Sequence, residues 1–86
     1  MPTISIFFGI IVRMLYRYTE APHIHVQYQT YNAILDIATA NVIEGKLPIR
    51  QARFAQAWVE IHKDDLIANW ELCRCGEAPV KLKPLR

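Results

Sequence analysis

Pro22-His23-Ile24-His25-Val26 is the most informative stretch of this 86-residue chain. Histidines and aliphatic residues alternate after a proline, and in a β-strand successive side chains point to opposite faces. The pattern therefore predicts a strand with His23 and His25 on one face and Ile24 and Val26 on the other. Two imidazoles about 6 to 7 Å apart on one strand face can act as metal ligands, as an acid/base pair or as a plain polar surface.

The segment that follows alternates in the same way. Residues 32–38 carry aliphatic side chains at alternate positions, and a connecting loop of two or four residues would place three of them on the same face as Ile24 and Val26. The expected core face of this hairpin then consists of Ile24, Val26, Ala33, Leu35 and Ile37.

Asp36 falls on the opposite face of the same hairpin, together with the two histidines. A loop at Gln29-Thr30 would place Asp36 across from His23, and a loop at Thr30-Tyr31 would place it across from His25. Either pair would favour the imidazolium form and raise the pKa of that histidine. A three-residue loop would break this arrangement, and no glycine is present to mark the turn type.

Three further segments complete a sheet in the first half of the chain. Thr3–Phe8 and Ile10–Tyr18 are rich in β-branched and aromatic residues and are separated by Gly9, and a short strand is expected at Val42–Gly45. Because such closely spaced strands leave no room for crossovers, the sequence predicts an antiparallel meander of four to five strands.

The hydrophobic period changes after Pro48. No glycine or proline lies between Pro48 and Gly76, and at 100° per residue most apolar side chains fall on one arc. The sequence predicts one long C-terminal helix up to Cys75, although Asp64 or Asp65 could cap a second helix. This helix would cover one face of the sheet.

The end of the chain alternates again at Val80–Lys83, which predicts a short edge strand guarded by lysines. Taken together, residues 1–86 are expected to form a single small α+β domain.

Composition narrows the function classes. The chain is 52% hydrophobic with a formal net charge of +2, too small to argue for nucleic acid by itself. Its longest apolar run is too short to span a membrane and lacks the features of a signal peptide. Cys73 and Cys75 form neither a disulfide framework nor a C-x-x-C site.

We expect a cytoplasmic protein with no cofactor and no resident metal. Its thin core favours a homodimer or a small protein partner.

Three further side chains are candidates for binding. Arg13 and Arg17, with Tyr16 and Tyr18 interleaved, would line a strand surface suited to phosphates and stacked bases, unless the arginines only solvate the strand. His62 lies within the apolar arc of the helix. It is expected either to bond a sheet carbonyl or to converge with the strand histidines.

Several motifs of this chain occur together in one known group of proteins. They are Met1–Ser5 with Phe7–Ile10, the Pro-His-Ile-His-Val block, Val42–Pro48, Trp58 with Glu60 and His62, and Asn69–Leu72 before Gly76. With them the chain resembles the DUF4160 family of small bacterial proteins, whose domain is of unknown function. It departs from the family pattern at Ala21 (usually proline), at Ala40 (usually glycine) and at Cys73 and Cys75 (usually small residues).

The resemblance implies a small accessory protein encoded beside another small protein, in the manner of toxin–antitoxin or regulatory pairs. It therefore favours an interaction or regulatory component. The residues leave two alternatives open. One is a ribonuclease or RNA-binding protein in which His23 and His25 share acid and base roles, helped by Asp36 and Arg17. The other is a metal-binding module of both histidines with a carboxylate such as Glu20 or Asp36.

Overall fold

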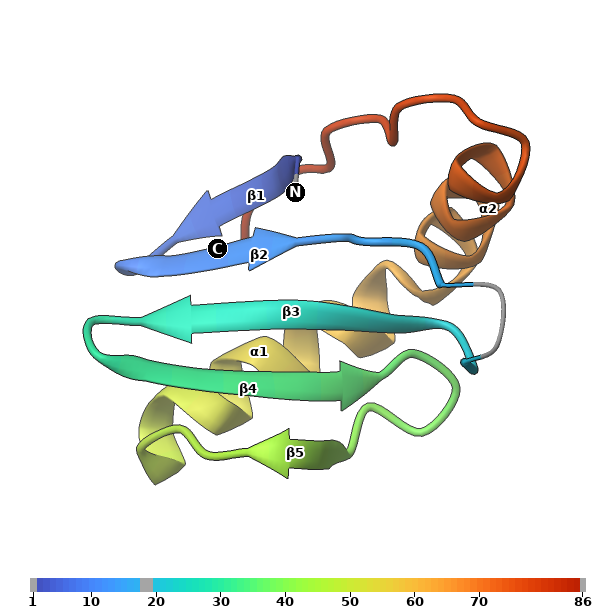
Figure 1. Cartoon of the computed structure of the whole chain (residues 1–86). Helices are drawn as coiled ribbons and strands as arrows, with labels where there is room; N and C mark the ends of the chain where they lie inside the picture. The colour runs from blue at the N-terminus through green and yellow to red at the C-terminus, as the bar shows by residue number, and fades with distance from the viewer. Residues whose placement is uncertain (1, 18–19, 86) are drawn as a thin grey trace.

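The computed structural model of the chain describes residues 2–17 and 20–85. Its strands form one antiparallel sheet in the order of the sequence, and two helices follow (Figure 1). The elements are β1 (Thr3–Phe7), β2 (Ile10–Arg13), β3 (His23–Tyr28), β4 (Tyr31–Asp36), β5 (Val42–Gly45), α1 (Ile49–Ile61) and α2 (Lys63–Arg74). The predicted α+β meander is confirmed, with five strands.

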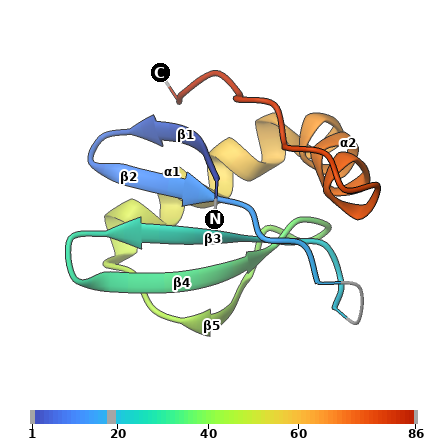
Figure 2. The ribbon, with the colours of Figure 1, turned by 45° about the horizontal axis from the view of Figure 1, so that its top comes forward.

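The helices lie on one side of the sheet. In Figure 1 the sheet faces the viewer and α1 crosses behind β3 and β4, while α2 lies at the end of the sheet where β3 begins. The turned view in Figure 2 shows the same arrangement and leaves the opposite face of the sheet free of helices. In the described part of the chain, no helix is long and apolar enough to cross a membrane.

The predicted core face of the hairpin is confirmed. All five of its aliphatic residues are at most 4% exposed. Trp58 of α1 is fully buried against this face, and its ring stacks on Phe7 with 5.6 Å between the centroids. The apolar face of the strands and the apolar arc of α1 therefore pack together in one hydrophobic core. This is expected from the two-residue period of a strand and the 3.6-residue period of a helix.

The expectation of one long helix is wrong, because the helix breaks at His62. The backbone of His62 has φ −105° and ψ 18°, outside the helical range. Asp64 and Asp65 then occupy the first turn of α2, where negative charges stabilise a helix N-terminus. The break turns α2 away from α1, so that Trp70 reaches the start of β3.

The C-terminal tail, residues 80–85, runs beside β1 but does not form the expected edge strand. One sheet-like bond joins the two segments, from the N–H of Leu82 to the carbonyl of Ile4 (2.8 Å). The backbone of Val80 is instead bound by a side chain, because the Asn69 amide donates to its carbonyl (2.8 Å) and accepts from its N–H (2.9 Å). These bonds to α2 replace a strand ladder.

Left-handed backbone occurs at six of the described residues, Phe8, Gly9, Gln29, Ala40, Gly45 and Gly76, and two of these positions bear on how β5 approaches β4. Ala40, at the position where the resembled family usually has glycine, adopts φ +62° in the turn between β4 and β5. Gly45 closes β5 with φ +75°, and a Cβ there would lie 2.2 Å from the carbonyl oxygen of Asn32. Gly45 thus allows β5 to approach β4 closely.

Candidate binding site

The strand register aligns four side chains across the uncovered face of the sheet. Arg13 of β2 pairs with His25 of β3, His25 pairs with Ile34 of β4, and Ile34 pairs with Glu44 of β5. Directly paired residues of antiparallel strands lie on the same face. Because the neighbours of His25 in β3 are the buried Ile24 and Val26, these four residues lie on the face opposite the core. We refer to Arg13, His25, Ile34 and Glu44 as the charged row.

The charged row surrounds a hollow of about 300 Å³. Gln27 and Asn32, which pair with each other across β3 and β4, complete its polar lining. The Arg13 guanidinium donates from Nη1 to Oε1 of Gln27 at 2.6 Å. Among residues 2–17 and 20–85, no carboxylate lies within ion-pair distance of Arg13. The hollow therefore holds an arginine whose charge is not neutralised by a neighbour.

His25 is the titratable group at the middle of the row. Burial lowers the pKa of His25 from its usual 6.5, and the neighbouring His23 and Arg17 lower it further, against the opposite influence of Glu20 and Glu44. Its Nε2 atom is buried and has no hydrogen-bond partner within the described residues. The surroundings of the imidazole therefore favour its neutral form over the imidazolium.

His23 lies beside His25 but is enclosed. Its ring packs on that of His25 (5.2 Å between centroids) and on that of Trp70 (5.0 Å), and the residue is only 2% exposed. Nδ1 lies 2.9 Å from the carbonyl oxygen of Ala21, and since a carbonyl can only accept, this nitrogen carries a proton. Nε2 lies 3.5 Å from a carboxylate oxygen of Glu20. The two histidines meet as predicted, but Trp70 of α2 covers one of them.

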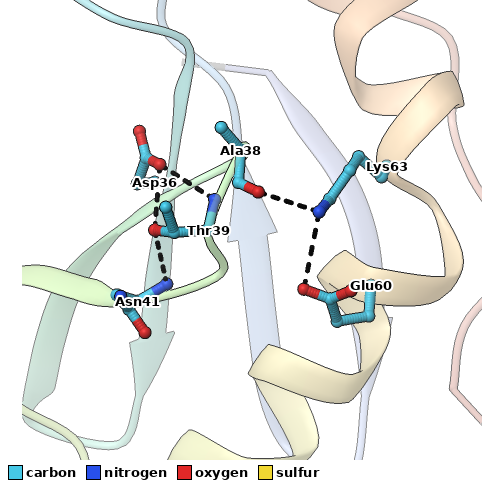
Figure 3. Close-up of polar contacts among 6 residues, drawn as sticks. All are labelled: Asp36, Ala38, Thr39, Asn41, Glu60 and Lys63. Carbon is cyan, nitrogen blue, oxygen red and sulfur yellow. Dashed lines mark hydrogen bonds and ion pairs between the residues drawn. The ribbon is translucent and has the colours of Figure 1, made fainter.

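Asp36 lies opposite His23 in the register, which is the arrangement predicted for a loop at Gln29-Thr30 and not for one at Thr30-Tyr31. The expected ion pair between them is nevertheless absent from the described contacts. Figure 3 shows one carboxylate oxygen of Asp36 accepting from the backbone N–H and the hydroxyl of Thr39, both at 3.0 Å. The carboxylate thus closes the turn between β4 and β5, because the two donors of Thr39 in this turn lie nearer to it than the imidazole of His23 does.

His62 does not converge with the strand histidines. Its ring packs on Trp58 with 4.9 Å between centroids, and its Nδ1 lies 3.7 Å from a carboxylate oxygen of Asp65. Both neighbours belong to the helices. His62 therefore marks the junction of α1 and α2 rather than the site on the sheet.

The two arginines do not share a strand. β2 ends at Arg13, whereas the prediction extended it to Tyr18, a residue outside those described. Arg17 lies in the connection that follows and acts on the pKa of His25. Tyr16 packs on Trp70 with 5.0 Å between centroids, so its ring is occupied within the fold. Among the described residues, Arg13 and Arg17 therefore do not lie on one strand with the ring of Tyr16 free between them.

A metal centre is not assembled either. Within residues 2–17 and 20–85, no three side chains of His, Cys, Asp or Glu come together in a way that could hold an ion. The set of both strand histidines with Glu20 or Asp36 is thus not brought together as a ligand group.

Sequence reasoning missed four residues of the site, namely Gln27, Asn32, Ile34 and Glu44. Gln27 follows His23 and His25 at alternate positions of the same strand. This alternation was the signal in the sequence that could have placed Gln27 on their face. Glu44 could not be placed, because the pairing of β4 and β5 shifts between Ile34 and Leu35. An irregularity of this kind changes the face to which later residues point.

A family model described as "Domain of unknown function (DUF4160)" matches residues 9–71 of the chain. This span contains all four residues of the charged row and both helices except the last residues of α2. No curated protein and no solved structure matches the chain.

Proposed function

The chain belongs to the DUF4160 family, and from this premise we propose that it is an interaction protein that binds a protein partner through the uncovered face of its sheet. One observation carries the proposal. No helix lies over the charged row, since α1 packs on the opposite face and α2 lies at the end of the sheet, where Trp70 covers His23, and the row surrounds a hollow of about 300 Å³. A folded domain that leaves one sheet face without a cover has a surface available for another molecule.

The chemistry of the face favours a protein over a nucleic acid. The row holds one positive and one negative side chain, and the same face carries Ile6 (60% exposed) together with the partly exposed Ile11 and Ile34. Protein interfaces mix apolar and polar side chains in this way. A surface for RNA needs an excess of positive charge and free aromatic rings. Tyr16, the nearest described tyrosine to the site arginines in sequence, packs on Trp70 instead.

The toxin–antitoxin-type role stays a prediction, and a face that binds a protein is what such a role requires. The ribonuclease alternative requires both imidazoles to reach a substrate. His23 is 2% exposed and lies under Trp70, which favours binding over catalysis.

The test compares proteins retained by the tagged wild type and by two variants in the host cell. Ile34→Arg places a long charged side chain in the uncovered face. Ile61→Arg makes the same change at a 66% exposed position of α1 and serves as the matched control. We expect a defined protein to bind the wild type and Ile61→Arg but not Ile34→Arg, and to form a one-to-one complex when purified.

A partner bound equally by all three chains would contradict the proposal, because it would bind elsewhere. Retention of RNA alone would favour the ribonuclease or RNA-binding alternative. The material retained by each of the three chains is therefore analysed for protein and for RNA.

A further inference from the structure

We infer that the partner of the uncovered face is a second copy of this chain, packed face to face about a twofold axis that runs along the strands between β3 and β4. The inference rests on the proposed function and names the partner. It is carried by the order of side chains in the charged row.

The row is self-complementary under this axis. Arg13 stands at one end and Glu44 at the other, with His25 and Ile34 between them. A twofold axis along the strands reverses the order, so Arg13 faces Glu44 of the second copy and Glu44 faces Arg13 of the second copy. An axis across the strands would instead place Arg13 against Arg13. The charges therefore select one of the two ways in which the faces can meet.

The same axis pairs the remaining side chains suitably. Gln27 and Asn32 are cross-strand partners on β3 and β4, so Gln27 comes to face Asn32 of the second copy. Two amides can donate to and accept from each other. His25 comes to face Ile34 of the second copy, where a neutral imidazole packs on an aliphatic side chain without burying a charge.

The hollow beside Arg13 is where the side chain of Glu44 from the second copy is expected to bind. Its guanidinium has an amide partner but, within the described residues, no carboxylate at ion-pair distance. The carboxylate of Glu44 in the second copy supplies that group. Because Glu44 itself is exposed, it is free to extend toward the other chain.

The size of the face sets the expected strength of the pair. An axis between β3 and β4 superposes β2 to β5 on the same four strands of the second copy, and four strands about 4.8 Å apart and about five residues long make a face of roughly 19 by 17 Å. Two such faces bury less area than a stable interface usually does, so the dimer should be a weak one with a dissociation constant in the micromolar range. Sheets packed in this way lie about 10 Å apart with their strands nearly aligned.

The test uses charge reversal and sedimentation of the full-length chain at micromolar concentrations. Arg13→Glu sets two glutamates against each other at both ends of the interface, and Glu44→Arg does the same with two arginines. Each variant alone should dimerise at least about tenfold more weakly than the wild type. An equimolar mixture of the two variants should form a heterodimer, because every contact then joins opposite charges. Arg53→Glu, a reversal on the exposed side of α1, should dimerise as the wild type does.

Circular dichroism and melting temperature check that each variant is folded before it is compared. A wild type that remains monomeric, a variant that dimerises unchanged, or a mixture that does not associate would each overturn the inference. If the wild type is monomeric and the Ile34→Arg variant no longer binds a host protein, the partner is not a second copy of this chain, and the proposed function stands. If the wild type is monomeric and a host protein binds the Ile34→Arg variant as well as the wild type, both the inference and the proposed function are wrong.

Discussion

His25 shows how a single side chain departs from what its position in the sequence suggests. The alternation correctly predicts its face and its proximity to His23. His25 is not paired with Asp36, because the register places Asp36 opposite His23 and its carboxylate accepts from Thr39. Burial and neighbouring positive groups then decide the direction of the pKa shift.

The first prediction concerns the titration of His25. Since burial, His23 and Arg17 lower its pKa in the folded state, the unfolded chain binds the proton more readily. The stability associated with neutral His25 should be present above pH 6.5 and should be lost as the pH falls through the lowered folded value. NMR titration of the ring protons measures the pKa, and melting at several pH values measures the stability.

His25→Gln should reduce this pH dependence, because glutamine does not titrate in this range. Asp36→Asn serves as a control and should leave the pKa of His25 below 6.5. A folded pKa above 6.5 would show that the structural account of His25 is incorrect.

At the scale of the elements, side-chain bonds between segments distant in sequence hold the tail and the helix junction in place. The tail is bound to the side chain of Asn69, a buried polar residue of α2 that is 2% exposed. The junction of α1 and α2 is bound to the sheet through Lys63. Figure 3 shows its Nζ donating to the carbonyl of Ala38 at 2.8 Å and lying 3.6 Å from a carboxylate oxygen of Glu60.

We predict that Asn69→Ala releases the tail. The change removes both hydrogen bonds to the backbone of Val80, which should lower the free energy of unfolding by about 1 to 3 kcal/mol. Urea denaturation measures the loss, and amide hydrogen exchange at Leu82 should accelerate. Gln56→Ala on α1, the matched control, should change stability by less than about 0.5 kcal/mol. Unchanged exchange at Leu82 would mean that Asn69 does not hold the tail.

A second prediction at this scale concerns the helix junction. Lys63→Met keeps the aliphatic stem of the side chain but removes its bond to the carbonyl of Ala38. The free energy of unfolding should fall by about 0.5 to 1.5 kcal/mol, the usual net value of such a bond. Arg53→Met on α1 is the control and should have little effect. An equal loss in both variants, measured by urea denaturation, would assign the effect to surface charge instead.

At the scale of the whole molecule, one buried indole connects three parts of the chain. Trp58 stacks on Phe7 of β1, lies next to His62 at the helix junction, and donates from Nε1 to the carbonyl of Lys83 in the tail (2.9 Å). A domain of this size has few other side chains that reach the sheet, a helix end and the tail together. Its removal should therefore affect the fold as a whole.

Trp58→Ala should cost about 3 to 5 kcal/mol. A chain of this length has a total stability of roughly 4 to 13 kcal/mol, so the change removes between about a quarter and all of that stability, and the variant should melt far below the wild type. Trp58→Phe keeps an aromatic ring and loses mainly the bond to Lys83, so its melting temperature should lie between those of the alanine variant and the wild type. An alanine variant that melts like the wild type would show that α1 does not form the core with the sheet.

The strand order, the core face and the placing of Asp36 on the face of the two histidines followed from the sequence alone, because alternation is a local property of the backbone, whereas the choice of His23 rather than His25 as its partner followed from the structure. The break at His62, the enclosure of His23 by Trp70 and the bonding of the tail to Asn69 followed only from the tertiary structure. So did the charged row, whose last member, Glu44, depends on an irregular pairing between β4 and β5. The enclosure of His23, the bonding of the tail and the charged row join different elements of the chain, and the choice among competing hydrogen-bond partners is made only when the segments pack together.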